Sequence, residues 1–346
     1  MDVVIGAGVI GTATTWKLSK VSNRSIVNVS LCTDQTDTAS VANGCLVIGD
    51  YQPNRSIVNV VNHVWNGGVF GAWAALRSCG LSSWRSQKQP LCALCARGAA
   101  QIHDVLMKEQ KKTPSIIYKK NKKHFYVDAH EWNQYMKQMS LKKTNVTFVK
   151  DRVVGFGILK QQHKKNKQRV THVYCASGRI METNKVYISC GWKTPEICSL
   201  LGVRVPIYPL TGYSVTAHWE GPPSARHSLK TFQTWISFGS KVRCTANTDF
   251  FKDGVVPANL VVKRWDKITK DLQRVYPDAR GPYIKWVGHR PITPDALPII
   301  SNVEPFDNVY INAGHGPVGV TCCLSSADWV VNIPQDNPFS LERFSS

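Results

Sequence analysis

The stretch DVVIGAGVIG at residues 2–11 decides the fold of this chain. It begins as a short apolar run, turns through three glycines and leads into residues 12–19, where apolar side chains recur at helical spacing. Gly6 permits a tight turn, Gly8 lets a pyrophosphate approach the backbone, and Gly11 lets the helix pack closely on the strand. The helix N-terminus then presents unpaired N–H groups to the phosphates. The sequence therefore predicts a strand–turn–helix unit that binds a dinucleotide.

The length and composition predict two domains, or one core with a cap. The chain has 346 residues, 43% of them hydrophobic and 10% aromatic. Its 11 cysteines are scattered and odd in number, which favours a reducing compartment over a disulfide scaffold. Cys92 and Cys95 form a CxxC pair, but no matching His or Cys spacing completes a metal site. We therefore expect no metal.

The net charge of +20 is concentrated in two stretches, Lys108–Lys123 and Lys160–Arg169. Such stretches attract phosphates, anionic lipids or acidic partners. Aromatic residues are sparse within them, so we expect no specific nucleic-acid partner and leave peripheral membrane contact open. No signal peptide precedes the first strand, and Ile57–Leu76 is too interrupted by Asn and Gly to span a membrane. These features predict a cytoplasmic or mitochondrial protein.

The rest of the chain alternates predicted strands and helices. A second strand within Ile26–Cys32 ends near Asp34, which is the best candidate to bind ribose hydroxyls, with Asp37 second. Residues 73–107 read as largely helical with a break around 80–90, and Asp128 can cap another helix. Further strands are predicted at 146–150, 170–176 and 186–189, a mainly β segment at 203–287, and a final strand and helix at 308–312 and 318–331.

Two later clusters carry chemistry. Gly314 to Gly319, GHGPVG, joins a strand to a helix and points a second set of backbone N–H groups at an anionic group. Paired with the first turn, it favours a flavin over a nicotinamide, because a reduced isoalloxazine needs positive potential. Arg290 lies in GHRPITPD on a constrained backbone, and its guanidinium fork is suited to a carboxylate.

These clusters, in this order, resemble the FAD-dependent oxidoreductases of the D-amino-acid oxidase superfamily, and most of all the small-subunit type of D-amino acid dehydrogenase. The similar stretches are VVIGAGVIGTATTWKL at the start, ASVANG at 39–44, VYISCGW at 186–192, VPIYPLTGYSVT at 205–216, GHRPITPDALPII at 288–300 and NVYINAGHGPVGVT at 308–321.

The resemblance implies an extended FAD and an α/β fold with an α+β cap. Arg290 matches the family's carboxylate-binding arginine, assisted by Tyr213 or Trp235. Val154 is implied to contact adenine through its backbone. The FAD-binding set that it implies is Gly6, Gly8, Val9, Ile10, Gly11, Asp34, Ser40, Ala42, Asn43, Val154, Gly191, Arg290, Gly314, His315, Gly316, Val318, Gly319 and Thr321.

The implied domains are discontinuous. Residues 1–50, 140–202 and 286–346 form a Rossmann-like FAD domain, and residues 51–139 and 203–285 form a shortened substrate domain with a mainly antiparallel sheet. The chain departs from the family at Thr211, at Asn43-Gly44-Cys45, and between Val127 and Asp128, where the family carries additional residues.

The implied reaction is oxidative deamination of D-amino acids. A hydride passes from the α-carbon to flavin N5, and water hydrolyses the resulting imino acid to a 2-oxo acid and ammonia, with a quinone or oxygen as electron acceptor. Two alternatives remain open: an amine oxidase of the glycine or sarcosine type that uses oxygen, and a flavin-binding protein that has lost catalysis.

Overall fold

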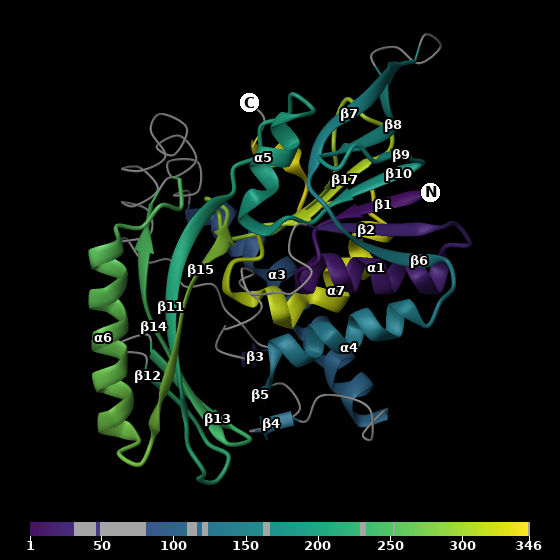
Figure 1. The fold of residues 1–346 in the computed structure, drawn as a ribbon. Helices are drawn as coiled ribbons and strands as arrows, with labels where there is room; N and C mark the ends of the chain where they lie inside the picture. Colours follow the sequence, from purple (N-terminus) through teal and green to yellow (C-terminus); the bar gives the residue numbers. More distant parts are fainter. Residues whose placement is uncertain are drawn as a thin grey trace.

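The computed structural model describes residues 1–30, 46–48, 81–108, 116–119, 124–161, 167–228, 233–251 and 253–344. A parallel sheet with its helices lies on the right of Figure 1, and a separate antiparallel sheet covered by one helix lies on the left. The predicted α/β class with an antiparallel cap is confirmed.

The central sheet has six strands in the order β16-β17-β10-β1-β2-β6. All neighbours in it are parallel except β16 and β17. The residues of β1 are buried throughout, as expected of a parallel strand covered on both faces. The six strands are β1 (Asp2–Ile5), β2 (Ile26–Ser30), β6 (Val146–Lys150), β10 (Lys185–Ile188), β16 (Ile299–Asn302) and β17 (Val309–Ala313).

Four helices lie together below the sheet in Figure 1: α1 (Val9–Val21), α3 (Leu81–Lys108), α4 (Ala129–Leu141) and α7 (Gly319–Val331). Helix α1 packs against α4 and α7, and α3 packs against α7. The predicted break around residues 80–90 is wrong, because α3 continues through Pro90. The predicted cap is confirmed, since Asp128 Oδ1 accepts hydrogen bonds from the His130 and Glu131 N–H groups at 2.8 and 3.1 Å.

A three-stranded antiparallel sheet and a short helix complete the parallel half. The elements are β7 (Val153–Lys160), β8 (Gln168–Cys175), β9 (Ile180–Glu182), the 3-10 turn η1 (Gly191–Lys193) and α5 (Thr194–Ser199). Val173 and Ile197 from these elements share one buried cluster with Val3 and Val186 of the central sheet.

The antiparallel half is a five-stranded sheet in the order β12-β13-β14-β11-β15, hereafter the substrate sheet. Helix α6 (Ala258–Val275) covers one of its faces, where Ile268 and Leu272 pack with Val215 and Cys244. The strands are β11 (Tyr208–His218), β12 (Ala225–Ser228), β13 (Gln233–Phe238), β14 (Lys241–Phe250) and β15 (Arg280–Ile292). A smaller sheet holds β3 (Leu46–Ile48), β5 (His124–Val127) and β4 (Ile116–Lys119).

The predicted domain boundaries stay a prediction. The six central strands come from the three segments assigned to the FAD domain. However, α3 and most of α4, which were assigned to the substrate domain, pack against α7 and α1 beside the central sheet. Two further short turns, η2 (Gly316–Val318) and η3 (Leu341–Phe344), lie near the C-terminus.

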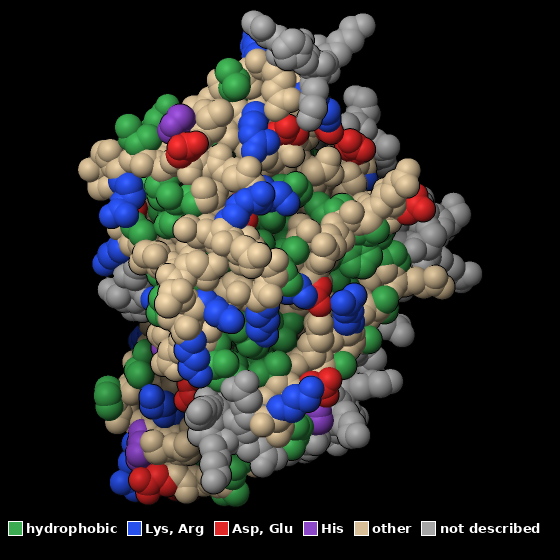
Figure 2. All heavy atoms as spheres, turned by 90° about the vertical axis from the view of Figure 1, so that its right-hand side faces the viewer, with side chains coloured by type: hydrophobic (Ala, Val, Ile, Leu, Met, Phe, Trp, Pro, Cys, Tyr) green, Lys and Arg blue, Asp and Glu red, His purple; other side chains and the backbone are tan. Residues whose placement is uncertain are grey.

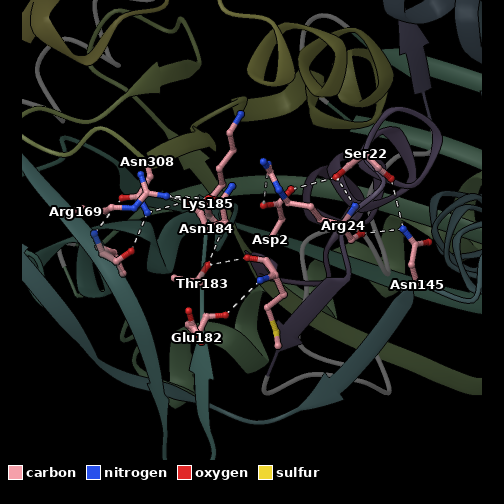
Figure 3. A network of polar contacts seen from close by, with 12 residues as sticks. Asp2, Ser22, Arg24, Asn145, Arg169, Glu182, Thr183, Asn184, Lys185 and Asn308 are labelled. Carbon is pink, nitrogen blue, oxygen red and sulfur yellow. Dashed lines mark hydrogen bonds and ion pairs between the residues drawn. The ribbon is translucent and has the colours of Figure 1, made fainter.

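A polar network closes the edge of the central sheet at which β1, β2 and β10 begin (Figure 3). Ser22 Oγ donates to Asp2 Oδ2 at 3.3 Å, and Asn145 Nδ2 donates to the Arg24 carbonyl at 2.8 Å. Nearby, Arg169 donates to the side-chain oxygen of Asn184 at 2.8 Å. The polar side chains at this edge bond to one another and to the backbone. A ligand site is therefore expected at the opposite edge, where the carboxyl ends of the parallel strands lie.

The basic side chains form no single block on the face drawn in Figure 2. Lys and Arg side chains are spread over that face between apolar ones, with acidic groups among them. Within the described ranges, no helix is long and apolar enough to cross a membrane. Peripheral membrane contact stays a prediction.

Candidate functional site

A cavity of about 420 Å³ lies at the carboxyl ends of the parallel strands and reaches the substrate sheet. Ile5, Ser30, Ser189 and Ala313, at or just after the ends of β1, β2, β10 and β17, line it. Ligands of open α/β sheets bind at this edge, and the volume is in the range of small-molecule sites. Eleven predicted site residues line it: Gly6, Gly8, Val9, Ile10, Gly191, Tyr213, Arg290, Gly314, His315, Gly316 and Gly319.

The first glycine turn has the close packing that the sequence predicts. Gly6 has a φ of +113°, and a Cβ there would collide with the Ser189 carbonyl at the end of β10. A Cβ on Gly11 would collide with the Gly6 carbonyl, so the turn and α1 are in direct backbone contact. Gly8 is the N-cap of α1, where no side chain caps the helix and no acidic residue lies in the first turn. An anion can therefore approach this helix end.

Side chains from three elements hold the turn in shape. Thr12 Oγ1 donates to the Ala7 carbonyl at 3.1 Å, and Asn28 Nδ2, from β2, donates to the Gly6 carbonyl at 3.0 Å. Asn133 Nδ2, from α4, donates to the Ala7 carbonyl at 3.1 Å. Asn28 and Asn133 were not predicted from the sequence, because no local pattern links them to the turn.

The second glycine turn also lines the cavity. Gly314 and Gly316 have φ angles of +79° and +52°, a region that favours glycine. His315, between them, is 2% exposed, and neither ring nitrogen has a hydrogen-bond partner among the described residues. Burial lowers the pKa of His315 to about 3, so its imidazole is neutral.

The unsatisfied polar atoms around the cavity indicate that a polar ligand belongs there. Besides His315, Ser189 Oγ and Asn312 Oδ1 are buried without a partner among the described residues, and both residues line the cavity. Buried polar groups are normally hydrogen-bonded, so such a cluster on one wall is informative. Together with the glycine cradle, these atoms fit a dinucleotide such as FAD.

The residues predicted to bind the ribose, Asp34 and Asp37, and those predicted beside the flavin, Ser40, Ala42 and Asn43, lie outside the described residues, and their roles stay predictions. Two side chains that were not predicted from the sequence also line the cavity.

Ser30, the last residue of β2, is one of them, and Asp151, just after β6, is the other. The Asp151 carboxylate accepts a short hydrogen bond from Ser177 Oγ, which is the main cause of its lowered pKa.

Arg290 lies on the cavity side of the substrate sheet. A Cβ added to Gly212, on the neighbouring strand, would be 3.5 Å from a terminal nitrogen of its guanidinium. The guanidinium therefore rests on a glycine rather than on a side chain, within the same cavity as both glycine turns. This placement is compatible with the predicted carboxylate-binding role, which stays a prediction.

Tyr213 and Trp235 are directed toward α6. The Tyr213 hydroxyl donates to Asp249 Oδ2 at 2.8 Å, and Arg264 of α6 also donates to Asp249, at 2.7 and 2.9 Å. Trp235 packs in the cluster between the substrate sheet and α6, and it does not line the cavity. Tyr213 lines the cavity, but these contacts do not support either residue as an assistant of Arg290.

The remaining predicted residues within the described ranges do not line the cavity. Gly11, Val318 and Thr321 are in or next to the helix starts that line it. The Val154 side chain is 43% exposed, whereas its neighbour Val153 lines the cavity. A backbone contact of Val154 with adenine stays a prediction. Over the residues that the structure describes, no group of three His, Cys, Asp or Glu side chains could hold a metal.

The chain is similar to curated bacterial D-amino acid dehydrogenases. The chain is 29% identical over 228 residues to the D-amino acid dehydrogenase of Chromohalobacter salexigens, which covers 62% of the chain and 51% of the relative. It is 29% identical over 158 residues to D-amino acid dehydrogenase 2 of Pseudomonas aeruginosa. This match covers 43% of the chain and 36% of the relative. The chain therefore spans about half the length, or less, of these relatives.

Solved structures share the fold at low identity. Glycine oxidase of Bacillus cereus has a TM-score of 0.67 at 16% identity, covering 96% of both chains. Iminodiacetate oxidase of Chelativorans sp. has a TM-score of 0.64 at 17% identity, covering 100% of this chain and 98% of that one. The family model described as FAD dependent oxidoreductase matches residues 3–333, which confirms the prediction of FAD as cofactor. The chain belongs to this family of FAD-dependent oxidoreductases.

Proposed function

We propose that this protein oxidises D-amino acids with FAD to 2-oxo acids and ammonia. The observation that carries the proposal is the position of the Arg290 guanidinium in the cavity that both glycine turns line. An arginine fork binds a carboxylate in a bidentate pair and so fixes the orientation of an amino acid relative to the cofactor. The curated relatives named D-amino acid dehydrogenase support the choice of substrate.

In this proposal the chain binds and orients, and the cofactor supplies the redox chemistry. FAD, when bound, accepts the hydride of the substrate α-carbon. Arg290 holds the carboxylate, and the walls of the cavity exclude water from the α-carbon. His315 is neutral and buried, so it adds no positive charge beside the cofactor. In this proposal a quinone or oxygen accepts the electrons.

The test is anaerobic reduction of the FAD-loaded protein by a panel of D-amino acids, their L-enantiomers, glycine and sarcosine. Bleaching of the flavin absorbance by D-amino acids, and much less by the others, is the expected result. Faster bleaching by glycine or sarcosine would instead establish the amine oxidase alternative. No bleaching by any amine, with FAD fully bound, would contradict catalysis and favour a flavin-binding protein.

Arg290→Ala gives the residue-level test. Loss of one partner of a buried charged pair costs about 2–5 kcal/mol, so substrate affinity should fall by about 30-fold or more. Arg290→Lys should restore only part of this, because lysine lacks the bidentate fork. Arg280→Ala, at the exposed start of the same strand, is the matched control. Equal affinity for a D-amino acid in the wild type and Arg290→Ala would remove Arg290 from the site.

A further inference from the structure

Four alternate residues of β15 point to the same side of the substrate sheet, and three of them, Trp286, Gly288 and Arg290, line the cavity. Ile292, Arg290, Gly288 and Trp286 share one face of the strand, because side chains alternate between the faces of a sheet. At the cofactor end, Ile292 Cγ2 would be 3.7 Å from a Cβ on Gly316 of the second glycine turn. Arg290 follows, and Trp286 is the farthest of the four from that turn along the strand. Both Arg290 and Trp286 line the cavity.

Two glycines form the floor under these side chains. Gly212 of β11 and Gly288 of β15 are direct cross-strand partners. The Arg290 guanidinium lies over Gly212, and the Trp286 indole covers Gly288 so closely that a Cβ there would collide with the ring. Directly opposed residues in antiparallel strands are about 4.5–5.5 Å apart at Cα. The guanidinium and the indole therefore lie over adjacent positions.

This juxtaposition matches the dimensions of an amino acid. A carboxylate bound to the guanidinium leaves the substrate side chain about one residue's width away, next to the indole. The face of an indole binds aromatic and large apolar groups by stacking and burial. A methyl-sized side chain, such as that of alanine, would leave most of that face uncovered.

We propose that Trp286, lying over Gly288 beside Arg290, is the specificity-determining residue of this site and selects amino acids with an aromatic or large apolar side chain. The inference rests on the proposed function, since it takes Arg290 as the carboxylate anchor. The alternative role of such a ring is a steric barrier that admits only small substrates. Binding measurements separate the two roles.

The experiment uses two unreactive probes on the FAD-loaded protein. 3-Phenylpropionate and propionate are the frames of phenylalanine and alanine without the amine, so they bind without reducing the flavin. Their dissociation constants come from the perturbation of the flavin absorption spectrum. We expect the wild type to bind 3-phenylpropionate at least tenfold more tightly, from burial of the ring against the indole.

Variants then assign the preference to Trp286. Trp286→Leu should lower the ratio of the two affinities roughly tenfold, and Trp286→Phe should keep most of it. Gly288→Ala should lower the ratio as well, because its Cβ displaces the indole without removing it. Trp219→Leu is the matched control, since Trp219 directly follows β11 of the same sheet but packs on Tyr276 and does not line the cavity.

The binding ratios distinguish a failure of this proposal from a failure of the proposed oxidation. An unchanged ratio in Trp286→Leu, or tighter 3-phenylpropionate binding after the indole is removed, overturns the proposal, as does a wild type that binds neither probe. If the ratios behave as expected but no D-amino acid bleaches the flavin, the specificity role stands and only the proposed oxidation fails.

Discussion

The Asn133 amide donates a hydrogen bond to the Ala7 carbonyl at 3.1 Å, and so joins α4 to the middle of the first glycine turn. Asn133 is fully buried, and Trp132 beside it packs edge-on against Trp16 of α1 at a centroid distance of 6.4 Å. The turn is therefore braced from a helix that lies more than a hundred residues away in the sequence. We expect the shape of this turn, the predicted pyrophosphate site, to depend on the Asn133 hydrogen bond.

Asn133→Ala should weaken FAD binding. A buried hydrogen bond contributes about 0.5–1.5 kcal/mol, and its loss leaves the Ala7 carbonyl with Thr12 alone among the side-chain donors described above. We expect the dissociation constant of FAD to rise about three- to tenfold in a fluorescence titration. Asn145→Ala, which removes a hydrogen bond at the opposite edge of the sheet, should leave FAD affinity unchanged. Equal effects of the two variants would show that both act through stability alone.

Gly11→Ala should abolish FAD uptake. A Cβ there collides with the Gly6 carbonyl, and backbone cannot move aside as a flexible side chain can. The helix would be pushed from the strand and the turn would open. Gly155→Ala is the control, because its Cβ would make an ordinary 3.5 Å contact with the Tyr174 ring. Flavin absorbance after reconstitution is the measurement, and normal uptake by Gly11→Ala would show that the turn tolerates the displacement.

Tyr213→Phe should lower stability more than it lowers substrate affinity. Burial, and then Asp249, raise the pKa of Tyr213, so its hydroxyl is a neutral donor to that carboxylate. Hydrogen bonds to charged groups contribute about 1.5–3 kcal/mol to the free energy of unfolding. Chemical denaturation should detect this loss, while the affinity for a D-amino acid stays within about threefold of the wild type, since the hydroxyl is held by Asp249. A loss of affinity comparable to that of Arg290→Ala would place the hydroxyl on the substrate.

Stability should fall as the pH is lowered below about 6.5, through His315. Burial lowers the pKa of His315 from 6.5 to about 3 in the folded protein, so between these values the unfolded chain binds a proton that the folded chain does not. One such group makes the free energy of unfolding fall by about 1.4 kcal/mol per pH unit in that window. His289 adds to the effect, since burial and Lys193 lower its pKa too.

Chemical denaturation of the FAD-loaded protein at pH 7 and pH 5 measures how the free energy of unfolding changes with pH. His315→Gln should flatten this dependence, because glutamine does not titrate. His218→Gln, at an exposed site beside Glu220, should not. A His315→Gln slope equal to that of the wild type would mean that the imidazole is already protonated in the folded protein.

The parts of the fold that the sequence predicted are those with local causes. The turn at Gly6 to Gly11, the Asp128 cap and the strand that ends before Gly191 depend on neighbours within a few residues. The break expected near Pro90 was wrong, because packing of α3 on α7 overrides the cost of one proline in the helix.

The parts of the site that the sequence did not predict depend on distant contacts. Asn133 reaches Ala7 from another helix, and the Arg290 and Trp286 side chains meet over a pair of glycines from two strands. Period-two alternation along β15 would have placed Trp286 on the face of Arg290, but not over Gly288. Only the register between β11 and β15 shows that Gly212 and Gly288 lie opposite each other beneath these two side chains.

The order of the strands in the central sheet also bears on how the protein is made. β1 pairs with β10, and β10 pairs with β17, so the middle of the sheet joins residues near 5, 188 and 311. The first glycine turn is synthesised long before β17, so the site that it lines is incomplete until residues 309–313 have been synthesised. Pairings of such long sequence separation form slowly. A nascent chain that stops short of β17 should expose an unfinished parallel sheet, and FAD should therefore be captured only after β17 has been synthesised.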